Sequence, residues 1–514
     1  MLLSREIQEQ LNIIKNSYIA QRYSETISKS KKLLKQLPNN NYLMNIIGLS
    51  YNGLGDHENA KKIFSKILNI NPNNLDAKNN YATTLKYLSE IDEAEEIFES
   101  IIDEDQRNVH ALNNLANIKR DKKKNEEAIL LYKKIIEIND NLAIVHYNLS
   151  LTYLQLKKRE LAKQHALIVN TLDPKFILSD QILNTLIDYS DDGGHFKVLQ
   201  NKLRDESLDD NLKSQVNFML GKAYEDKKDY ENSFFHYQKA NFLKRKNIKY
   251  SIEFEEENFE KIQNLFKDQK NLNLDSVQSY NQKIIFICGM PRSGTTLVDQ
   301  IISTHSKVQS MEETGFLNKI IKSENLLNKN SFLTKIKLHE DQIYKKFLKM
   351  TDKFKFKETY LTDKSLFNFK YIGFIKVFFP KCKVLVLKRD FDNNLLSIFK
   401  NSFQSQNLNW TYDIKEIESF YKLYLKYLDL WQNVFPNSFM TVNYEDLIIN
   451  LEEQTKKMLN YCGLNWEIDC LKYFEKNKSS ISTVSSNQAS QPIYNKSLDK
   501  YKFYRKFFQK KTAL

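Results

Sequence analysis

The segment from Lys283 to Ile302, KIIFICGMPRSGTTLVDQII, decides the fold of the second half of this 514-residue chain. The run Lys283–Cys288 is apolar and rich in β-branched residues, which is typical of a buried strand. Gly289–Thr296 turns the chain, and Leu297–Ile302 has a helical pattern. A strand, a glycine-containing loop and a helix in this order aim backbone N–H groups and a helix N-terminus at a phosphate. The segment therefore predicts an α/β domain with a phosphate-binding loop.

The loop departs from a nucleotide P-loop at one position. Gly289 and Gly294 have the spacing G-x-x-x-x-G, but Thr295 stands where an NTPase needs Lys to reach the β- and γ-phosphates. Arg292 and the hydroxyls of Thr295 and Thr296 replace that lysine. These groups suit a ligand with one bridging phosphate and a sulfuryl group better than a Mg²⁺-triphosphate. This position and the lack of a Walker-B pattern argue against a kinase.

The first half of the chain repeats every 34 residues. An alanine recurs at this period, and an aromatic residue follows it four positions later. The columns are Ala60, Ala94, Ala128 and Ala162, then Phe64, Phe98 and Tyr132, with small residues at Gly48, Ala82, Ala116 and Ser150. Two antiparallel helices pack closely where one carries a small residue and an aromatic fills the adjacent space. The pattern resembles the tetratricopeptide repeat (TPR) over residues 7–176, with a further repeat at 214–247.

These patterns predict an all-α TPR solenoid followed by an α/β, P-loop-like domain with a parallel sheet. We expect the repeat array over residues 1–247, a connector over 248–282 and the second domain over 283–514. A fragment that begins near Asn271 is then expected to bind nucleotide by itself. The concave face of such an array commonly binds peptides or partner helices, although a purely structural scaffold is equally compatible with the sequence.

The composition narrows the class of protein. The net charge is +13, but the 77 basic and 64 acidic residues are mixed along the helices, so we expect solvated faces and no nucleic-acid partner. The four cysteines form no CxxC pair, and no Asp-rich or His-rich cluster occurs, so neither a metal nor a disulfide framework is expected. The opening MLLSREIQEQLNIIKN has no apolar signal region, and no 18-residue apolar window follows. We expect a cytoplasmic, reducing setting.

The motif PRSGTT after a buried strand resembles the 5′-phosphosulfate loop of sulfotransferases that use 3′-phosphoadenylyl sulfate (PAPS). The resemblance covers about residues 283–505 and is closer to the tyrosylprotein branch and to bacterial TPR-containing sulfotransferases. It implies a parallel sheet related to that of nucleotide kinases, with PAPS as the co-substrate and no metal. It also implies that the loop holds the phosphosulfate through Arg292, Ser293, Gly294, Thr295 and Thr296.

The resemblance implies two catalytic residues near this loop. In the stretch SMEETG, Ser310–Gly315, the second glutamate is Glu313, and it follows Arg292 by 21 residues, the family spacing. It would act as the base that takes the proton of the acceptor hydroxyl. His305 is a rival base because other sulfotransferase branches use His, although a capping role is also open. Lys364, after a short strand, matches a lysine that stabilises the leaving group.

A second apolar strand, Lys383–Lys388, ends in Arg389, and Ser397 follows eight residues later on the next helix. Both side chains can donate hydrogen bonds to one phosphate. The spacing matches the 3′-phosphate pair of the family. Two positions depart from the family pattern, since Phe391 stands where Pro is frequent and Asn401 where some relatives carry a basic residue.

Three candidates come from the resemblance late in the chain. Tyr444 in the expected strand Phe439–Leu447 matches a cofactor-contacting position, although a buried strand-end tyrosine is an equally simple interpretation. Ser485 matches a serine that contacts the transition state, and Lys500 matches a basic residue at a cofactor phosphate.

The resemblance therefore implies a sulfotransferase that moves a sulfuryl group from PAPS to a hydroxyl. A protein tyrosine, a sugar and a lipid all remain open as acceptors. The alternative is a TPR interaction scaffold whose P-loop-like domain binds nucleotide but is inactive. The sequence indicates no oligomeric state.

Overall fold

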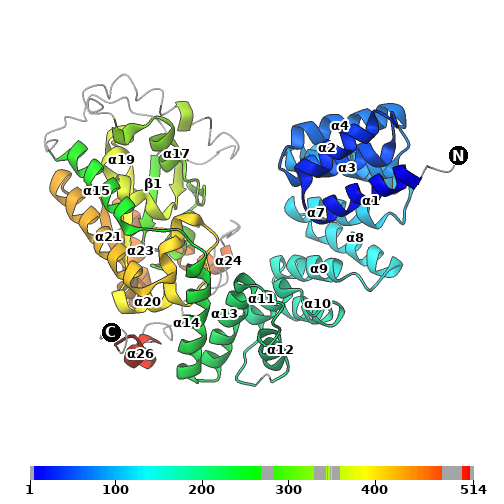
Figure 1. Cartoon of the computed structure of the whole chain (residues 1–514). Helices are drawn as coiled ribbons and strands as arrows, with labels where there is room; N and C mark the ends of the chain where they lie inside the picture. The colour runs from blue at the N-terminus through cyan, green and yellow to red at the C-terminus, as the bar shows by residue number, and fades with distance from the viewer. Residues whose placement is uncertain are drawn as a thin grey trace. The chain divides into compact units, whose positions relative to one another are not determined.

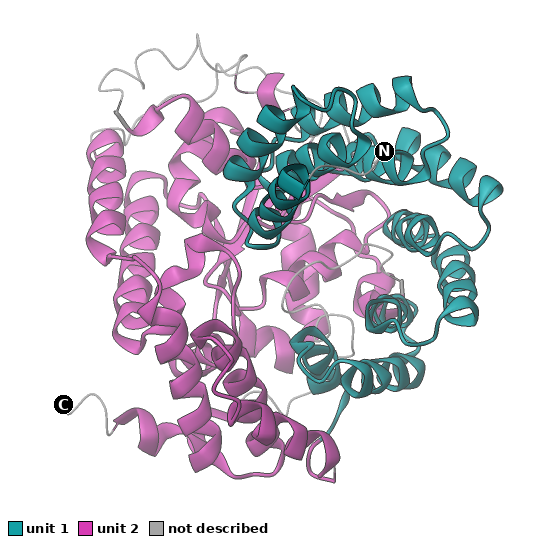
Figure 2. Cartoon of the chain, turned by 45° about the vertical axis from the view of Figure 1, so that its right-hand side comes forward, with its two compact units in different colours: residues 1–188 teal, residues 189–514 magenta. Residues whose placement is uncertain are grey.

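The computed structural model of the chain describes residues 5–191, 193–267, 283–328, 343, 345–347, 349, 359–476 and 500–509. The chain divides into two compact units, Met1–Asp188 and Tyr189–Leu514 (Figure 2). The first unit is helical. The second combines helices with a five-stranded sheet. The predicted fold class, an all-α repeat array followed by an α/β domain with a parallel sheet, is confirmed.

The first unit is built from successive helical hairpins (Figure 1). Its helices are α1 Arg5–Ile19, α2 Tyr23–Leu34, α3 Asn41–Gly53, α4 His57–Ile70, α5 Leu75–Tyr87, α6 Ile91–Glu104, α7 Val109–Asp121, α8 Asn125–Ile138, α9 Ala143–Gln155, α10 Arg159–Leu172 and α11 Ile177–Leu186. The starts of α3, α5, α7 and α9 are 34 residues apart. Asparagine side chains cap three of these helices, since Asn40, Asn74 and Asn108 each accept a hydrogen bond from a first-turn N–H.

The repeating columns lie in the core of the hairpins, as the sequence predicts. The alanines and the aromatics of the two columns are fully buried: Ala60, Ala94, Ala128, Ala162, Phe64, Phe98 and Tyr132. A Cβ atom added to Gly48 would lie 2.5 Å from the Phe64 ring. Close approach of the two helices therefore requires the small residue at this column.

The second unit holds a parallel sheet with the strand order β2-β3-β1-β4-β5. The strands are β1 Lys283–Gly289, β2 Val308–Ser310, β3 Tyr360–Asp363, β4 Lys383–Lys388 and β5 Met440–Asn443. Because the chain moves from β1 to one side for β2 and β3 and then to the other side for β4, β1 lies at the switch point of the topology. Ligands of open α/β sheets bind at the carboxyl ends of the strands near such a point.

Helices bury both faces of the sheet. On β1, Phe286 and Cys288 belong to one hydrophobic cluster, and Ile285 and Ile287 belong to the other. This alternation is the two-residue period of a strand, and burial of both faces explains why the strand is apolar throughout. The helices of the first face include α15 Ile252–Phe266, α17 Phe316–Ser323, α19 Ile372–Phe378, α20 Phe391–Phe399 and α21 Ile414–Val434 (Figure 1).

The other face is covered by α16 Thr295–Ser303, α22 Tyr444–Ile449, α23 Leu451–Cys462 and α24 Tyr473–Lys476. Short 3₁₀ segments join these elements, namely η1 Leu326–Asn328, η4 Leu366–Tyr371, η5 Gln406–Tyr412, η6 Ile468–Lys472 and η8 Lys500–Phe503. The remaining helices of the unit are α12 Gly194–Leu203, α13 Asp210–Asp226, α14 Tyr230–Lys246 and α26 Arg505–Gln509. The four cysteines are buried free thiols.

The last repeat packs with the sheet domain, so the compact units divide at residue 188 and not at the expected 247. Phe234 and Tyr237 of α14 belong to the same hydrophobic cluster as Phe286 of β1. Helix α15, which we expected in a connector, buries Phe266 against Trp431, with the ring centroids 5.2 Å apart. A fragment that begins near Asn271 would lack these side chains and expose the core, so our expectation for that fragment needs correction.

No helix in the described part of the chain combines the length and the hydrophobicity needed to cross a membrane.

The small-residue column generates a stability prediction at Gly221. A Cβ atom there would lie 2.6 Å from the buried ring of Tyr237, so Gly221→Ala should lower the free energy of unfolding by about 1–3 kcal/mol through overpacking. Chemical denaturation of the full chain measures this loss. Gly193→Ala is the matched control, because nothing lies within 4 Å of a Cβ atom at Gly193 and its φ is −96°. Equal effects of the two substitutions would contradict the packing argument.

Candidate functional site

The loop between β1 and α16 has the backbone geometry of an anion site. Arg292 and Gly294 have φ angles of +64° and +104°, which turn the chain sharply before the helix. The N–H of Ser293 donates to the carbonyl of Met290 at 3.2 Å, and Gly294 caps α16 without a side chain. The first N–H groups of an α-helix have no partner within the helix, and the helix dipole favours negative charge there, so the start of α16 suits an anion.

Three neighbours hold this loop in place. Asn394 of α20 is buried and donates from Nδ2 to the carbonyl of Pro291 at 3.0 Å. Arg389 donates from Nη1 to the carbonyl of Arg292 at 2.9 Å. The ring of Tyr444 covers Gly294 so closely that an added Cβ atom would lie 2.5 Å from it. The loop shape is thus fixed by residues that follow β4 and β5.

The predicted 3′-phosphate residues come together next to the loop. Arg292 donates from Nε to Ser397 Oγ at 3.3 Å. The guanidinium carbon of Arg389 lies 4.5 Å from the centre of the Tyr444 ring, a cation–π arrangement. Burial lowers the pKa of Arg389 from its ordinary value, but the guanidinium stays charged at neutral pH. The region presents two fixed guanidinium groups.

Two buried polar atoms at this place fit an anionic ligand. Within the described ranges, Ser293 Oγ and Arg389 Nε are buried and have no hydrogen-bond partner. Buried polar groups in folded proteins are nearly always paired, so such donors beside a helix N-terminus indicate a partner with acceptor oxygens. The residues present therefore fit a ligand with phosphate-type oxygens, as PAPS has.

The two predicted catalytic side chains contact each other. Lys364 Nζ lies 2.9 Å from Glu313 Oε1. The side chain of Lys364 is 2% exposed, whereas that of Glu313 is 44% exposed. A buried ammonium thus holds a carboxylate that solvent or a substrate can reach. Both residues follow the carboxyl ends of strands, Glu313 after β2 and Lys364 after β3.

Two buried aspartates that the sequence analysis missed hold this pair. Asp363 accepts hydrogen bonds from Ser365 N at 2.9 Å, from Asn368 Nδ2 at 3.1 Å and from the Thr314 hydroxyl. Gly315 N also donates to Ser365 Oγ at 3.0 Å. These bonds tie the segment of Glu313 to the segment of Lys364. Burial raises the pKa of Asp363, and its hydrogen bonds oppose that shift.

Asp299 is the second of these aspartates. It lies on α16 and accepts from Thr362 Oγ1 at 2.5 Å and from Ser310 Oγ at 2.8 Å, which joins the loop helix to β3 and β2. Burial raises its pKa. The sequence carried a signal for this residue, because an acid inside the apolar run LVDQII must find buried donors.

His305, the other candidate for the base, lies toward the amino ends of the strands, away from Glu313 and Lys364. Helix α16 begins at the carboxyl edge and runs back over nine residues, about 14 Å, before His305. The imidazole is buried, with Nε2 3.0 Å from the carbonyl of Asn465 and Nδ1 accepting from Lys307 N at 3.1 Å. Both ring nitrogens have structural partners, in agreement with the capping interpretation.

The late candidates differ in their placement. The strand that we expected over Phe439–Leu447 ends at Asn443, and Tyr444 instead opens α22, where its ring supports the phosphate loop. Ser485 lies outside the described residues. Lys500 is ion-paired with Glu225 of α13 at 2.8 Å.

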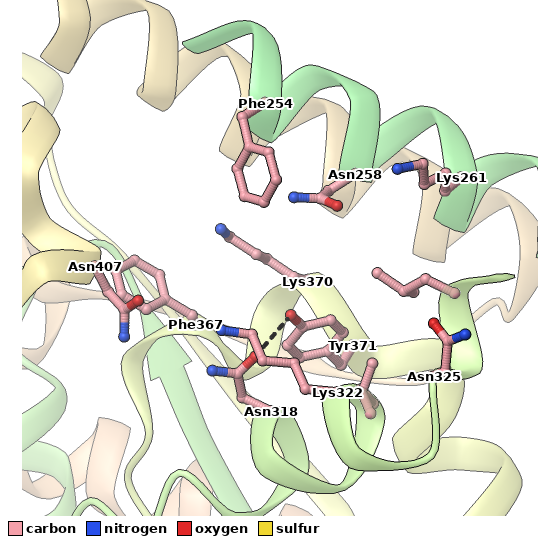
Figure 3. A pocket seen from close by; sticks show the side chains of 12 residues that line it. Phe254, Asn258, Lys261, Asn318, Lys322, Asn325, Phe367, Lys370, Tyr371 and Asn407 are labelled. Carbon is pink, nitrogen blue, oxygen red and sulfur yellow. Dashed lines mark hydrogen bonds between the residues drawn. The ribbon is translucent and has the colours of Figure 1, made fainter. Parts of the chain in front are cut away.

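A pocket of about 270 Å³ is formed by α15, α17, η4 and η5 (Figure 3). Its lining mixes apolar side chains, such as Phe254, Ile321 and Phe367, with lysines and asparagines, namely Lys261, Lys322, Lys370, Asn258, Asn318, Asn325 and Asn407. Tyr371 donates to Asn318 Oδ1 at 3.2 Å across its floor. Helix α17 begins three residues after Glu313, and η4 begins two residues after Lys364, so two of the four elements that form the pocket follow these residues closely in the chain.

Comparison with known proteins finds matches to both the sheet domain and the repeats. Residues 285–468 match the model of the sulfotransferase family, and residues 52–118, 109–142 and 214–247 match tetratricopeptide repeat models. The chain carries a sulfotransferase-family domain and TPR repeats. The sulfotransferase match contains every strand except the start of β1.

Two curated relatives and one solved structure illustrate the likeness. An uncharacterized protein of Aquifex aeolicus is 27% identical over 62% of this chain, which spans 44% of that relative. Protein-tyrosine sulfotransferase 1 of Danio rerio is 24% identical over 45% of this chain and 69% of its own. A thermophilic TPR protein of Thermus thermophilus is 14% identical, with a TM-score of 0.33 over 35% of this chain and 98% of its own.

Within the described ranges, no group of three or more His, Cys, Asp or Glu side chains is placed to hold a metal ion.

The loop geometry predicts that Gly294→Ala disrupts anion binding. The substitution forces a side chain into a φ of +104° and against the Tyr444 ring. Strain of this kind costs about 1–3 kcal/mol, so the affinity for adenosine 3′,5′-bisphosphate should fall by about tenfold or more in calorimetry. Gly193→Ala is the control and should bind as the parent chain does. Unchanged binding by Gly294→Ala would mean that the nucleotide does not use this loop.

Proposed function

We propose that the chain is a PAPS-dependent sulfotransferase that acts on a hydroxyl acceptor. The observation that carries the proposal is the Glu313–Lys364 pair, placed at the same sheet edge as Ser293 and Arg389, whose buried Oγ and Nε atoms have no partner among the described residues. The match to the sulfotransferase family supports it. The likeness to protein-tyrosine sulfotransferase 1 of Danio rerio supports it as well.

PAPS supplies an activated sulfuryl group together with a 5′- and a 3′-phosphate. The first turn of α16 and the hydroxyls of Ser293, Thr295 and Thr296 would hold the 5′-side oxygens, with Arg292 beside them. Arg389 and Ser397 would hold the 3′-phosphate. The buried donors and the helix N-terminus support these roles, because both favour phosphate-type oxygens.

In our proposal Glu313 takes the proton of the acceptor hydroxyl as the acceptor oxygen attacks the sulfur. The bond between the sulfur and the 5′-phosphate oxygen breaks, and adenosine 3′,5′-bisphosphate leaves. The carboxylate is reachable from solvent and is held by Lys364, which fixes its direction. Lys364 also places a buried positive charge where negative charge develops on the leaving side. Ser485 remains a candidate contact to the transferred group.

The pocket formed by α15, α17, η4 and η5 is our candidate for the acceptor. Lys261, Lys322 and the four asparagines favour a hydrophilic or anionic group beside the reactive hydroxyl, whereas Lys370 is ion-paired with Glu255. A protein tyrosine, a sugar and a lipid headgroup are all compatible with this chemistry. The repeats would recruit a macromolecular acceptor or partner, and we place the enzyme in the cytoplasm as an expectation from its sequence.

The Arg389–Ser397 pair predicts nucleotide selectivity. The parent chain should bind adenosine 3′,5′-bisphosphate more tightly than ADP in calorimetry. Arg389→Ala should weaken the bisphosphate by about 10- to 100-fold, because a charge-assisted hydrogen bond contributes about 1.5–3 kcal/mol. ADP affinity should change less. Equal affinities of the parent chain for both nucleotides would overturn the 3′-phosphate assignment.

Glu313→Gln tests the chemistry, because it keeps the shape of the side chain and removes the proton acceptor. Turnover should fall by about 10²–10⁴-fold, the usual contribution of a general base, while nucleotide affinity changes little. The assay follows release of adenosine 3′,5′-bisphosphate from PAPS in the presence of an acceptor.

Two control variants accompany Glu313→Gln. Glu312→Gln should cost much less, since the backbone of Glu312 contacts Lys364 but its carboxylate has no assigned role. His305→Ala should reduce stability and leave the chemistry of the folded fraction intact, because both ring nitrogens have structural partners. Activity that survives in Glu313→Gln and disappears in folded His305→Ala would move the base to His305. Nucleotide binding without any turnover in the parent chain would favour the scaffold alternative.

A further inference from the structure

A buried carboxylate of the last repeat lies among cations that border the nucleotide site. Glu225, near the end of α13, has a side chain that is 9% exposed. It is ion-paired with Lys400, which ends α20, and with Lys500 at 2.8 Å. It also accepts a hydrogen bond from the Tyr504 hydroxyl at 3.0 Å. One carboxylate thus joins the repeat, the helix that carries Ser397, and the C-terminal segment.

Lys400 lies on the same side of the helix as Ser397, which we propose to bind the 3′-phosphate. It follows Ser397 by three residues, a spacing that places two side chains on the same side of a helix. Ser397 itself accepts a hydrogen bond from Arg292. Burial lowers the pKa of Lys400 and Glu225 opposes that shift, while the charges of Lys500 and, less strongly, of Arg292 in the phosphate loop lower it further.

The hairpin α13–α14 also fixes the position of Lys400. The ammonium group of Lys400 lies 5.9 Å from the centre of the Tyr237 ring and 5.8 Å from the centre of the Tyr504 ring. The carbonyl of the preceding residue, Phe399, accepts a hydrogen bond from Asn241 of α14 at 2.8 Å. The repeat therefore holds both the backbone and the side chain at the end of α20.

The charges around Glu225 favour the binding of an anionic ligand. Burial raises the pKa of Glu225, but Lys400 and Lys500 outweigh it and lower the pKa to about 2, so the carboxylate is ionised at neutral pH. Among the described residues the Glu225 carboxylate pairs with two lysines, and the charge of Arg292 also acts on Lys400. Arg389 has acidic neighbours of its own, Asp390 and Glu445. A buried ion pair rarely stabilises a fold more than apolar side chains would. A role in holding the lysine ammonium groups in position therefore explains the buried Glu225 better than a contribution to stability does.

We propose that Glu225 is a positioning residue of the donor site. It holds Lys400 and Lys500 beside the Arg389–Ser397 pair, so that the lysines add to recognition of the 3′-phosphate. The α13–α14 hairpin is then a part of the nucleotide-binding machinery, although its sequence belongs to the repeats. The inference rests on the proposed use of a 3′-phosphorylated nucleotide by this site.

The experiment measures the ratio of two affinities by calorimetry on the full chain. Adenosine 3′,5′-bisphosphate and 5′-AMP differ only in the 3′-phosphate, so the ratio of their affinities isolates that group. Glu225→Gln should lower the ratio by about tenfold, while the affinity for 5′-AMP stays within about twofold. Glu225→Asp keeps the charge and should retain more of the ratio than Glu225→Gln does.

Glu416 provides a matched control in the same unit. It pairs with Arg245 at 2.7 Å and joins α14 to α21, so it is another carboxylate that links the hairpin to the sheet domain. Glu416→Gln should lower the unfolding midpoint without changing the affinity ratio. A merely structural role for Glu225 would make the two variants behave alike, and that result would overturn the inference.

The double variant Glu225→Gln/Lys400→Met carries the test if the single variant does not fold, because it removes both charges of the buried pair. It should fold and show a ratio at least as low as that expected for Glu225→Gln. An unchanged ratio in either folded variant would overturn the inference. A ratio near one in the parent chain would instead overturn the proposed function, so the two failures are distinguishable.

Discussion

The site depends on the common direction of five parallel strands. Because every strand ends at the same edge of the sheet, the residues that follow them meet there although they are far apart in the chain. The phosphate loop follows β1, Glu313 follows β2, and Lys364 follows β3. Arg389 follows β4, and Tyr444 follows β5. Burial of both sheet faces by helices fixes this edge, so the geometry of the site is a consequence of the core.

The sequence predicted those parts of the fold whose signal is local. The 34-residue period predicted the hairpins, and the strand–loop–helix pattern predicted the sheet domain. The contacts that hold the site could not be predicted in this way, because they join distant segments. Nothing in the local pattern indicates that the Tyr444 ring covers Gly294. Nor does it indicate that Asp299 accepts hydrogen bonds from Thr362 and Ser310. Those pairings depend on strand order, which sequence periodicity does not specify.

The place of the last repeat shows a second limit of local patterns. Its sequence resembles the other repeats, and the family match at 214–247 agrees. Its apolar residues nevertheless pack into the core around the sheet, because Phe234 meets Phe399 and Phe508 instead of another hairpin. A repeat motif specifies how two helices pack together, whereas the partner of their outer face depends on the rest of the chain. The last repeat therefore belongs to the same compact unit as the sheet, because its outer face packs there.

The most direct test of the account is transfer of radiolabelled sulfate from PAPS. The parent chain is incubated with labelled PAPS and a cell extract as the source of acceptors, and the products are separated by class. The account predicts labelled sulfate esters that form together with an equal amount of adenosine 3′,5′-bisphosphate. Tight binding of the nucleotide with no labelled ester above background, across protein, saccharide and lipid fractions, would contradict it.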